Sequence, residues 1–74
     1  MATFKLNFKG LSCPLPIVKT SSEIRKGASG DIYEVTADDP GFEKDIAAWC
    51  NTTGNKLAGI AKTGKDITAT ITKK

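Results

Sequence analysis

Histidine is absent from this sequence of 74 residues, and its absence excludes two kinds of site. No cysteine can be activated by a Cys–His pair, and most zinc sites that mix cysteine and histidine ligands are ruled out. Cysteine is also scarce, because only Cys13 and Cys50 occur, 37 positions apart and without a CxxC pair. This spacing gives little support for a metal site, and we expect neither a metal nor another cofactor.

Long hydrophobic runs are absent too. No apolar stretch approaches the ~20 residues that a transmembrane helix needs, and no apolar segment typical of a signal peptide lies at the N-terminus. Small secreted domains usually contain more than two cysteines. We therefore expect a cytoplasmic protein with reduced thiols and no membrane span. A length of 74 residues predicts a single domain, residues 1–74, near the lower size limit for a stable core.

Charge of neither sign is in strong excess. Eleven Lys and Arg residues against eight Asp and Glu residues give a net charge of +3. This excess is too small and too scattered to indicate nucleic acid binding, which usually requires a clustered basic patch. We expect no direct contact with nucleic acid, and a charged surface that is mostly solvated.

The sequence does contain regular hydrophobic patterning. Alternation with a period of two predicts strands, and apolar spacing of three and four predicts helices. The predicted elements, in order, are strand 3–8, helix 14–26, strand 31–37, helix 40–53, strand 56–63 and strand 66–72. A bulge near Gly59 would bring Leu57 and Ile60 onto one face, and Gly64-Lys65 is typical of a two-residue hairpin turn.

Each predicted element has one face that should be directed toward a core. In the strands this face contains Phe4, Leu6, Phe8, Tyr33, Val35, Ala37, Ile67, Ala69 and Ile71. In and around the helices it contains Ile17, Val18, Ser21, Ile24, Ala28, Phe42, Ile46, Trp49, Cys50 and Thr53. Two amphipathic helices and four half-apolar strands pack most simply as two layers. The predicted fold is α+β, a two-layer α/β sandwich with both helices on one face of a four-stranded mixed sheet.

Cys13 lies at the junction between the first strand and the first helix, in the stretch Gly10-Leu11-Ser12-Cys13-Pro14-Leu15-Pro16. Proline is favoured at the first helical position, so Pro14 predicts the helix start and places Cys13 at or near the N-cap. There the helix dipole favours an anion, which should lower the pKa of the thiol. Free cysteines are more often buried and inert. A loop-to-helix junction marked by two prolines nevertheless favours an exposed, reactive thiol.

Cys50 falls on the apolar face of the second predicted helix, beside Trp49. Burial in the core should raise the pKa of this thiol and keep it unreactive. The alternative is a secondary thiol that attacks a modified Cys13 and resolves it.

The stretch around Cys13 resembles the Cys-Pro-x-Pro signature of the TusA/SirA family of small sulfur-carrier proteins. A second block, Ala37-Asp38-Asp39-Pro40 with Asp45-Ile46 and Trp49-Cys50, is similar to the second-helix segment of that family. The resemblance implies that Cys13 carries sulfur as a persulfide, with Gly10, Pro14 and Pro16 supporting the motif. One departure is Asn7, where the family usually has an acidic residue.

The resemblance also implies partners. A donor protein of the cysteine desulfurase or rhodanese type would supply sulfur, and an acceptor protein would receive it, in a pathway such as tRNA thiolation or sulfur oxidation. We expect a monomer that acts as a relay rather than as an enzyme with turnover of its own. The sequence indicates no general base beside Cys13, so the partners are expected to complete the reaction.

The residues also bear on two other classes of function. A thiol redox enzyme of the thioredoxin type is disfavoured, because Pro16 occupies the position of the second cysteine in a CxxC motif. A noncatalytic regulatory or binding module, for RNA or protein, remains the alternative, although no cluster of stacking aromatic residues supports RNA binding.

Overall fold

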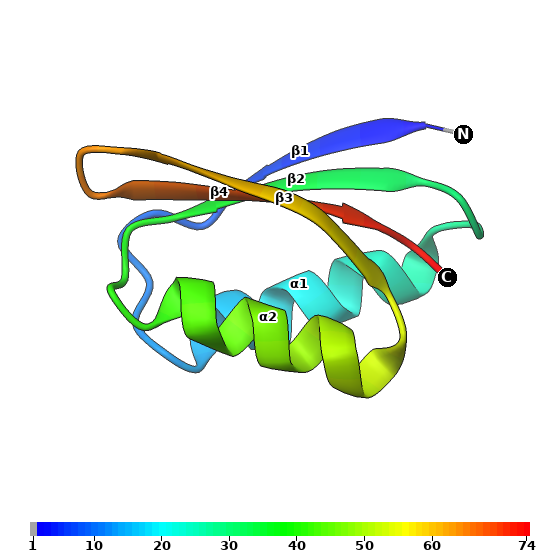
Figure 1. Ribbon diagram of the computed structural model, residues 1–74, viewed down its shortest axis with the longest axis horizontal. Helices are drawn as coiled ribbons and strands as arrows, with labels where there is room; N and C mark the ends of the chain where they lie inside the picture. Colours follow the sequence, from blue (N-terminus) through cyan, green and yellow to red (C-terminus); the bar gives the residue numbers. More distant parts are fainter. Residues whose placement is uncertain (1) are drawn as a thin grey trace.

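The protein consists of a four-stranded sheet with two helices on one face (Figure 1). The structure is a computed structural model that describes residues 2–74. The elements are β1 (Thr3–Asn7), α1 (Leu15–Lys26), β2 (Ile32–Ala37), α2 (Phe42–Thr53), β3 (Lys56–Thr63) and β4 (Asp66–Thr72). This order and the two-layer arrangement confirm the fold predicted from the hydrophobic patterning. Within the described residues, neither helix has the length and apolar character needed to cross a bilayer.

The sheet has the strand order β1-β2-β4-β3 and is mixed. β1 and β2 are parallel neighbours, while β2 with β4 and β3 with β4 are antiparallel. A parallel pair requires a crossover connection, and α1 provides it. Consequently the carboxyl ends of β1 and β2 lie at the same edge of the sheet, and each strand continues from there into a helix (Figure 1).

The core lies between the sheet and the helices, and β2, β4 and α2 contribute most of it. Every second residue of β2 and β4 is buried: Tyr33, Val35, Ala37, Ile67, Ala69 and Ile71. These side chains contact a buried row on α2, Phe42, Ile46 and Cys50, whose spacing of four places them on one side of the helix. Full burial of a large apolar side chain contributes about 1.5–3 kcal/mol. The inward faces predicted for β2 and β4 are therefore confirmed.

The inward face of α1 differs from the prediction. Its buried residues are Pro16, Thr20 and Ile24, while Val18 is 56% exposed. Thr20 can be buried because its hydroxyl donates a hydrogen bond of 2.7 Å to the carbonyl oxygen of Pro16. Val18 is two residues, or about 200°, around the helix from Pro16, so it points away from the sheet. Ala28 and Thr53, which were also expected to face inward, are exposed.

Both helices begin later than their prolines suggest. The N-cap of α1 is Pro14, so Cys13 lies one residue before the cap, and Pro16 is the proline within the first turn. The Cys13–Pro14 peptide bond is cis. The N-cap of α2 is Gly41, because Asp39 forms a turn in which its carboxylate accepts the N–H of Gly41 at 3.0 Å. The interpretation of Pro14 and Pro40 as first helical residues is wrong in both cases.

The β3–β4 hairpin matches its sequence signals. The pairing register shifts between Leu57 and Gly59, which confirms the predicted bulge. The strands are joined at Gly64-Lys65, with Thr63 paired to Asp66. At the other end of β3, Gly54 ends α2 in the left-handed conformation, with φ of +82°. Only glycine adopts this conformation without steric cost, which explains why the helix stops there.

Candidate functional site

Cys13 lies at the edge of the sheet where β1 and β2 both end. The loop from Phe8 to Pro14 leaves β1 and enters α1, and the loop from Asp38 to Gly41 leaves β2 and enters α2 (Figure 1). Ligand and active sites in sheets with parallel strands usually lie beyond the carboxyl ends of those strands. The fold thus brings the two sequence blocks around Cys13 and Asp39 to one end of the molecule.

Hydrogen bonds connect the two loops. The N–H of Phe8 donates to the carbonyl oxygen of Thr36 at 2.7 Å, which extends the β1–β2 pairing by one residue. The N–H of Gly10 then donates to the Asp38 carboxylate at 3.0 Å. Gly10 has φ of +86°, a conformation that other residues rarely adopt, so the predicted role of glycine in this turn is supported by its geometry. The position of the Cys13 loop is therefore fixed against the start of α2.

The Cys13 thiol is exposed and contacts a carboxylate. Its Sγ donates a hydrogen bond to Oδ2 of Asp45, at 2.9 Å, and Asp45 belongs to the first turn of α2. This hydrogen bond is the main cause that raises the pKa of Cys13 above its ordinary value. Some desolvation and the negative charges of Asp45 and Asp39 act in the same direction. The expected lowering of the Cys13 pKa by a helix N-terminus is therefore wrong for this structure.

The reason is that α1 offers few donors to the thiol. Pro14 and Pro16 have no N–H, and the N–H of Leu15 already donates to the carbonyl oxygen of Ser12 at 2.8 Å. Helix N-termini stabilise anions chiefly through their unpaired N–H groups. With these donors removed or engaged, the nearby carboxylates dominate the electrostatic environment of Cys13.

Cys50 is not part of this site. It is only 3% exposed, on the inward row of α2, and burial raises the pKa of its thiol to about 11. Both cysteines are free thiols. The predicted burial and raised pKa of Cys50 are confirmed, and both favour an unreactive thiol.

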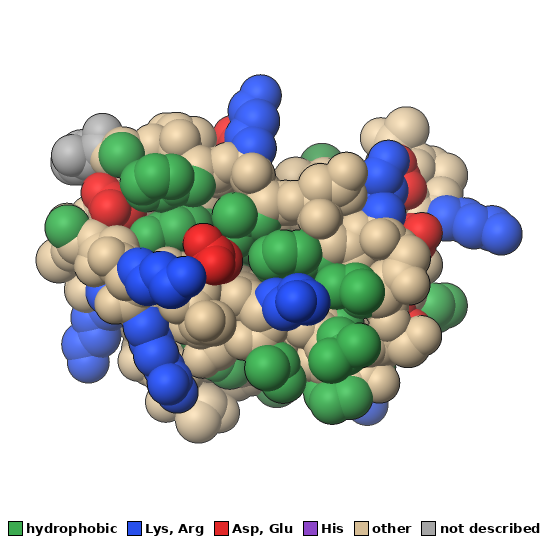
Figure 2. Space-filling view, turned by 180° about the vertical axis from the view of Figure 1, so that it is seen from behind, with side chains coloured by type: hydrophobic (Ala, Val, Ile, Leu, Met, Phe, Trp, Pro, Cys, Tyr) green, Lys and Arg blue, Asp and Glu red, His purple; other side chains and the backbone are tan. Residues whose placement is uncertain are grey.

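A groove lies between the outer sides of α1 and α2. It has a volume of about 400 Å³ and is lined by Pro14, Ile17, Val18, Ser21, Ser22, Arg25 and Trp49. Most of its surface is apolar, and it begins at the residue that follows Cys13. Hydrophobic side chains also gather among Lys and Arg on the face of the molecule shown in Figure 2. Among the described residues, the large hydrophobic side chains that are exposed are Phe4, Leu15 and Val18.

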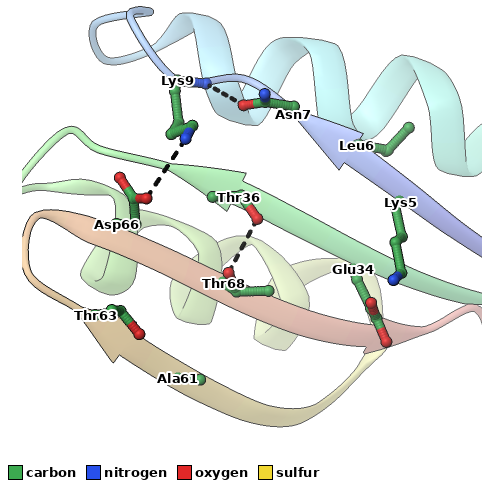
Figure 3. Close-up of a pocket in the computed structure, with 10 residues that line it drawn as sticks. All are labelled: Lys5, Leu6, Asn7, Lys9, Glu34, Thr36, Ala61, Thr63, Asp66 and Thr68. Atoms are coloured by element: carbon green, nitrogen blue, oxygen red, sulfur yellow. Dashed lines mark hydrogen bonds and ion pairs between the residues drawn. The ribbon is translucent and has the colours of Figure 1, made fainter.

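A second hollow, of about 450 Å³, lies on the outer face of the sheet and does not include Cys13 (Figure 3). Polar side chains across it bond with one another: Lys9 with Asp66 at 3.5 Å, and Thr36 with Thr68 at 2.9 Å. Asn7, the residue that departs from the family pattern, also lines this hollow, where its amide oxygen accepts the N–H of Lys9 at 3.1 Å. The replacement of the family's usual acidic residue by Asn7 therefore affects the outer face of the sheet.

The sequence predicts Cys13 as a site residue, but it does not single out Asp45, which contacts Cys13 in the structure. A carboxylate 32 positions away reveals its contact with Cys13 only when the fold is known. The available signal was that Asp45 belongs to the second block of the family resemblance. Among the described residues, no group of three or more Cys, Asp and Glu side chains is arranged to bind a metal ion.

Comparisons with known proteins find related sequences and a similar fold. The family model described as Sulfurtransferase TusA matches residues 4–73. The sulfur carrier protein TusA of Allochromatium vinosum is 42% identical over 59 residues, which cover 77% of this chain and 78% of that protein. A SirA-like protein from Desulfitobacterium hafniense has the same fold, with a TM-score of 0.82 at 18% identity over 93% of this chain and 95% of its own.

Other relatives are much longer than this chain. A provisionally named sulfur carrier protein of Aquifex aeolicus (strain VF5) is 48% identical over 63 residues, which cover 84% of this chain but 32% of that protein. A similarly named protein of Bacillus subtilis (strain 168), YrkF, is 39% identical over 64 residues, which cover 86% of this chain and 35% of YrkF. The chain thus spans about a third of these two relatives.

Proposed function

The chain belongs to the TusA family, and from this premise we propose that it is a sulfur carrier that holds sulfane sulfur as a persulfide on Cys13. A donor protein loads the sulfur, and an acceptor protein removes it. The observation that carries this proposal is the exposed thiol of Cys13, held at one end of the molecule by the loops that follow β1 and β2. A relay between two proteins requires a thiol that both of them can reach.

The chemistry at Cys13 is exchange between sulfur atoms. Such exchange requires a nucleophilic sulfur and access for the second sulfur, and it requires no cofactor. Persulfidation of a cysteine is a reversible modification, which suits a carrier. Pro14 and Pro16 support the site by limiting the conformations of the chain on either side of Leu15.

The groove between α1 and α2 supports contact with partner proteins. It begins at Pro14, directly after the thiol, and contains Trp49 and the exposed Val18. Aromatic residues and Arg are enriched where proteins bind one another, and Arg25 lines the far part of this groove. We place the docking of a cysteine desulfurase or rhodanese-type donor, and of the acceptor, on this side of the molecule, in the cytoplasm.

Sulfur loading of two matched variants tests the proposal. Each purified protein is incubated with a cysteine desulfurase and its substrate cysteine, then analysed by non-reducing mass spectrometry. The wild-type protein and Cys50→Ser should each gain about 32 Da, one sulfur atom, on Cys13. Cys13→Ala should fold normally, since the side chain is exposed, and should gain nothing.

The two variants also separate the roles of the thiols. Sulfur found on folded Cys13→Ala would show that another residue is the carrier, and the proposal would be abandoned. Loss of loading in folded Cys50→Ser would give Cys50 a part in the reaction, against its burial in the core.

A further inference from the structure

We propose that Asp45 is a catalytic residue of this carrier, accepting the proton of the Cys13 thiol as sulfur is loaded and returning it as sulfur is released. The inference rests on the proposed function, because it concerns the same thiol. It differs from that function by assigning the proton transfer to a side chain of this chain rather than to a partner.

The contact has the geometry that proton transfer requires. The 2.9 Å between Cys13 Sγ and Asp45 Oδ2 lies within the range of about 2.6–3.2 Å for a general base and its proton. The Asp45 backbone is fixed in α2, where its N–H donates to the carbonyl oxygen of Gly41 at 3.0 Å. A negative side chain is also favourable in the first turn of a helix, which helps to keep a carboxylate at this position.

The other groups around Cys13 leave this role to Asp45. The ionisable groups that raise the pKa of the thiol are Asp45 on α2 and Asp39 on the preceding loop. Asp39 is already engaged, because its carboxylate accepts the N–H of Gly41 at 3.0 Å. The sequence contains no histidine that could act in place of a carboxylate. A thiol that is protonated at rest needs a base at the moment of attack, and Asp45 touches it.

In the loading step, Cys13 Sγ attacks the terminal sulfur of a donor persulfide, R–S–SH. The bond between Cys13 and that sulfur forms while the donor S–S bond breaks. The thiol proton passes to Asp45 and then to the departing donor sulfur, so the products are Cys13–S–SH and R–SH. One sulfur atom moves with no net oxidation, and no other reactant is needed.

The release step is the reverse of loading with a different partner. An acceptor thiol, R′–SH, attacks the terminal sulfur of Cys13–S–SH, and the bond to Cys13 breaks. The proton from the acceptor reaches Asp45 and then Cys13 Sγ, which leaves as a thiol. The products are R′–S–SH and the resting Cys13, hydrogen-bonded to Asp45 as in the structure.

The substitution Asp45→Asn tests the proposal, because it keeps the size of the side chain and removes its basicity. Two rates are measured at neutral pH for folded protein: alkylation of Cys13 by iodoacetamide and loading from a cysteine desulfurase. Alkylation should stay equal or become faster, because the hydrogen bond and charge that raise the thiol pKa are weakened. Loading should slow by about 100-fold, the lower range for loss of a general base.

Two further variants provide the controls. Asp39→Asn removes a negative charge near the thiol without removing a contact to it, so loading should stay close to the wild-type rate. Asp45→Glu keeps a carboxylate and should recover part of the loading rate. If Asp45→Asn fails to fold, Asp45→Ala is measured in the same two assays, with the same expected results.

The outcomes are distinguishable. Slower loading with undiminished alkylation in Asp45→Asn supports proton transfer by Asp45, since a merely structural loss would lower both rates. Loading that is unchanged in Asp45→Asn, or equally slow in Asp39→Asn, would overturn the inference and leave the carrier function standing. Absence of loading in the wild-type protein would instead refute the proposed function, and the role of Asp45 with it.

Discussion

The two thiols of this protein are expected to differ in reactivity because their surroundings differ. The pKa of each is raised, for Cys13 by a hydrogen bond to Asp45 and for Cys50, to about 11, by burial. Access then decides between them, because Cys13 is exposed and Cys50 is 3% exposed. Reactivity at the scale of the residue therefore follows from exposure together with the thiolate fraction.

Alkylation of the folded protein should reflect this difference. We expect iodoacetamide to modify Cys13 well before Cys50 at neutral pH, because Cys50 reacts only when the core opens. Peptide mapping by mass spectrometry over a time course gives the two rates. In denaturant the two rates should become similar, and faster labelling of Cys50 in the folded state would contradict the assignment.

The residue scale is also where sequence reasoning was least complete. The motif around Cys13 and its place after the first strand predicted an exposed thiol, and the structure confirms the exposure. The predicted direction of the Cys13 pKa shift was wrong. Pro14 and Pro16 remove N–H donors, and only the fold brings Asp45 close to the thiol. A contact across 32 positions depends on how α2 packs, which no local pattern contains.

At the scale of elements, α1 ends in close contact with β2. Gly27 has an extended backbone, with φ of −83° and ψ of 176°, so its conformation does not require glycine. A Cβ atom at this position would lie 1.7 Å from the hydroxyl oxygen of Tyr33, whose side chain is buried in the core. Glycine is needed here because the ring of Tyr33 occupies the space of a side chain.

The substitution Gly27→Ala should therefore destabilise the protein. Overpacking of this kind typically costs about 1–3 kcal/mol, because the rigid ring or the end of α1 must move. Chemical denaturation monitored by circular dichroism measures the change in the free energy of unfolding. Gly59→Ala is the matched control, since nothing lies within 4 Å of a Cβ atom there. Equal stability of Gly27→Ala and wild type would contradict this account.

Elements with strict alternation were the most predictable. β2 and β4 are buried on alternate residues as the sequence indicates, and the irregular pattern of β3 corresponds to its bulge. The face of α1 was less predictable, because Thr20 is polar in sequence but buried through its bond to Pro16. Hydrophobicity alone cannot identify a buried side chain whose polar group is satisfied within its own helix.

At the scale of the whole molecule, the connection between α1 and β2 lies at the end opposite the Cys13 loop (Figure 1), and Asp31 belongs to this connection. Its carboxylate accepts the N–H of Ala28 at 2.9 Å and the N–H of Ala2 at 3.1 Å. These two hydrogen bonds lower the pKa of Asp31. The charged form is therefore favoured in the folded state, and the associated stability is present above the ordinary pKa and is lost as pH falls through the lowered one.

The pH dependence of Asp31→Asn checks this linkage. The variant should be less stable than wild type at neutral pH, because an amide forms weaker hydrogen bonds than a carboxylate. The difference should shrink on acidification, as the wild-type carboxylate becomes protonated. Thermal or urea unfolding at several pH values between neutral and strongly acidic measures it. A difference that is constant with pH would contradict the lowered pKa.

The positions of the chain ends have a consequence for proteins in which this fold is joined to other domains. The start of β1 and the C-terminal Lys74 lie at one end of the molecule, and the Cys13 loop lies at the other (Figure 1). The longest dimension is 30 Å, so a linker from either terminus needs roughly nine extended residues to return to the thiol. A domain attached by a shorter linker can reach Cys13 only if the domain itself spans the remaining distance. Where it does not, sulfur exchange with the thiol has to occur between separate molecules.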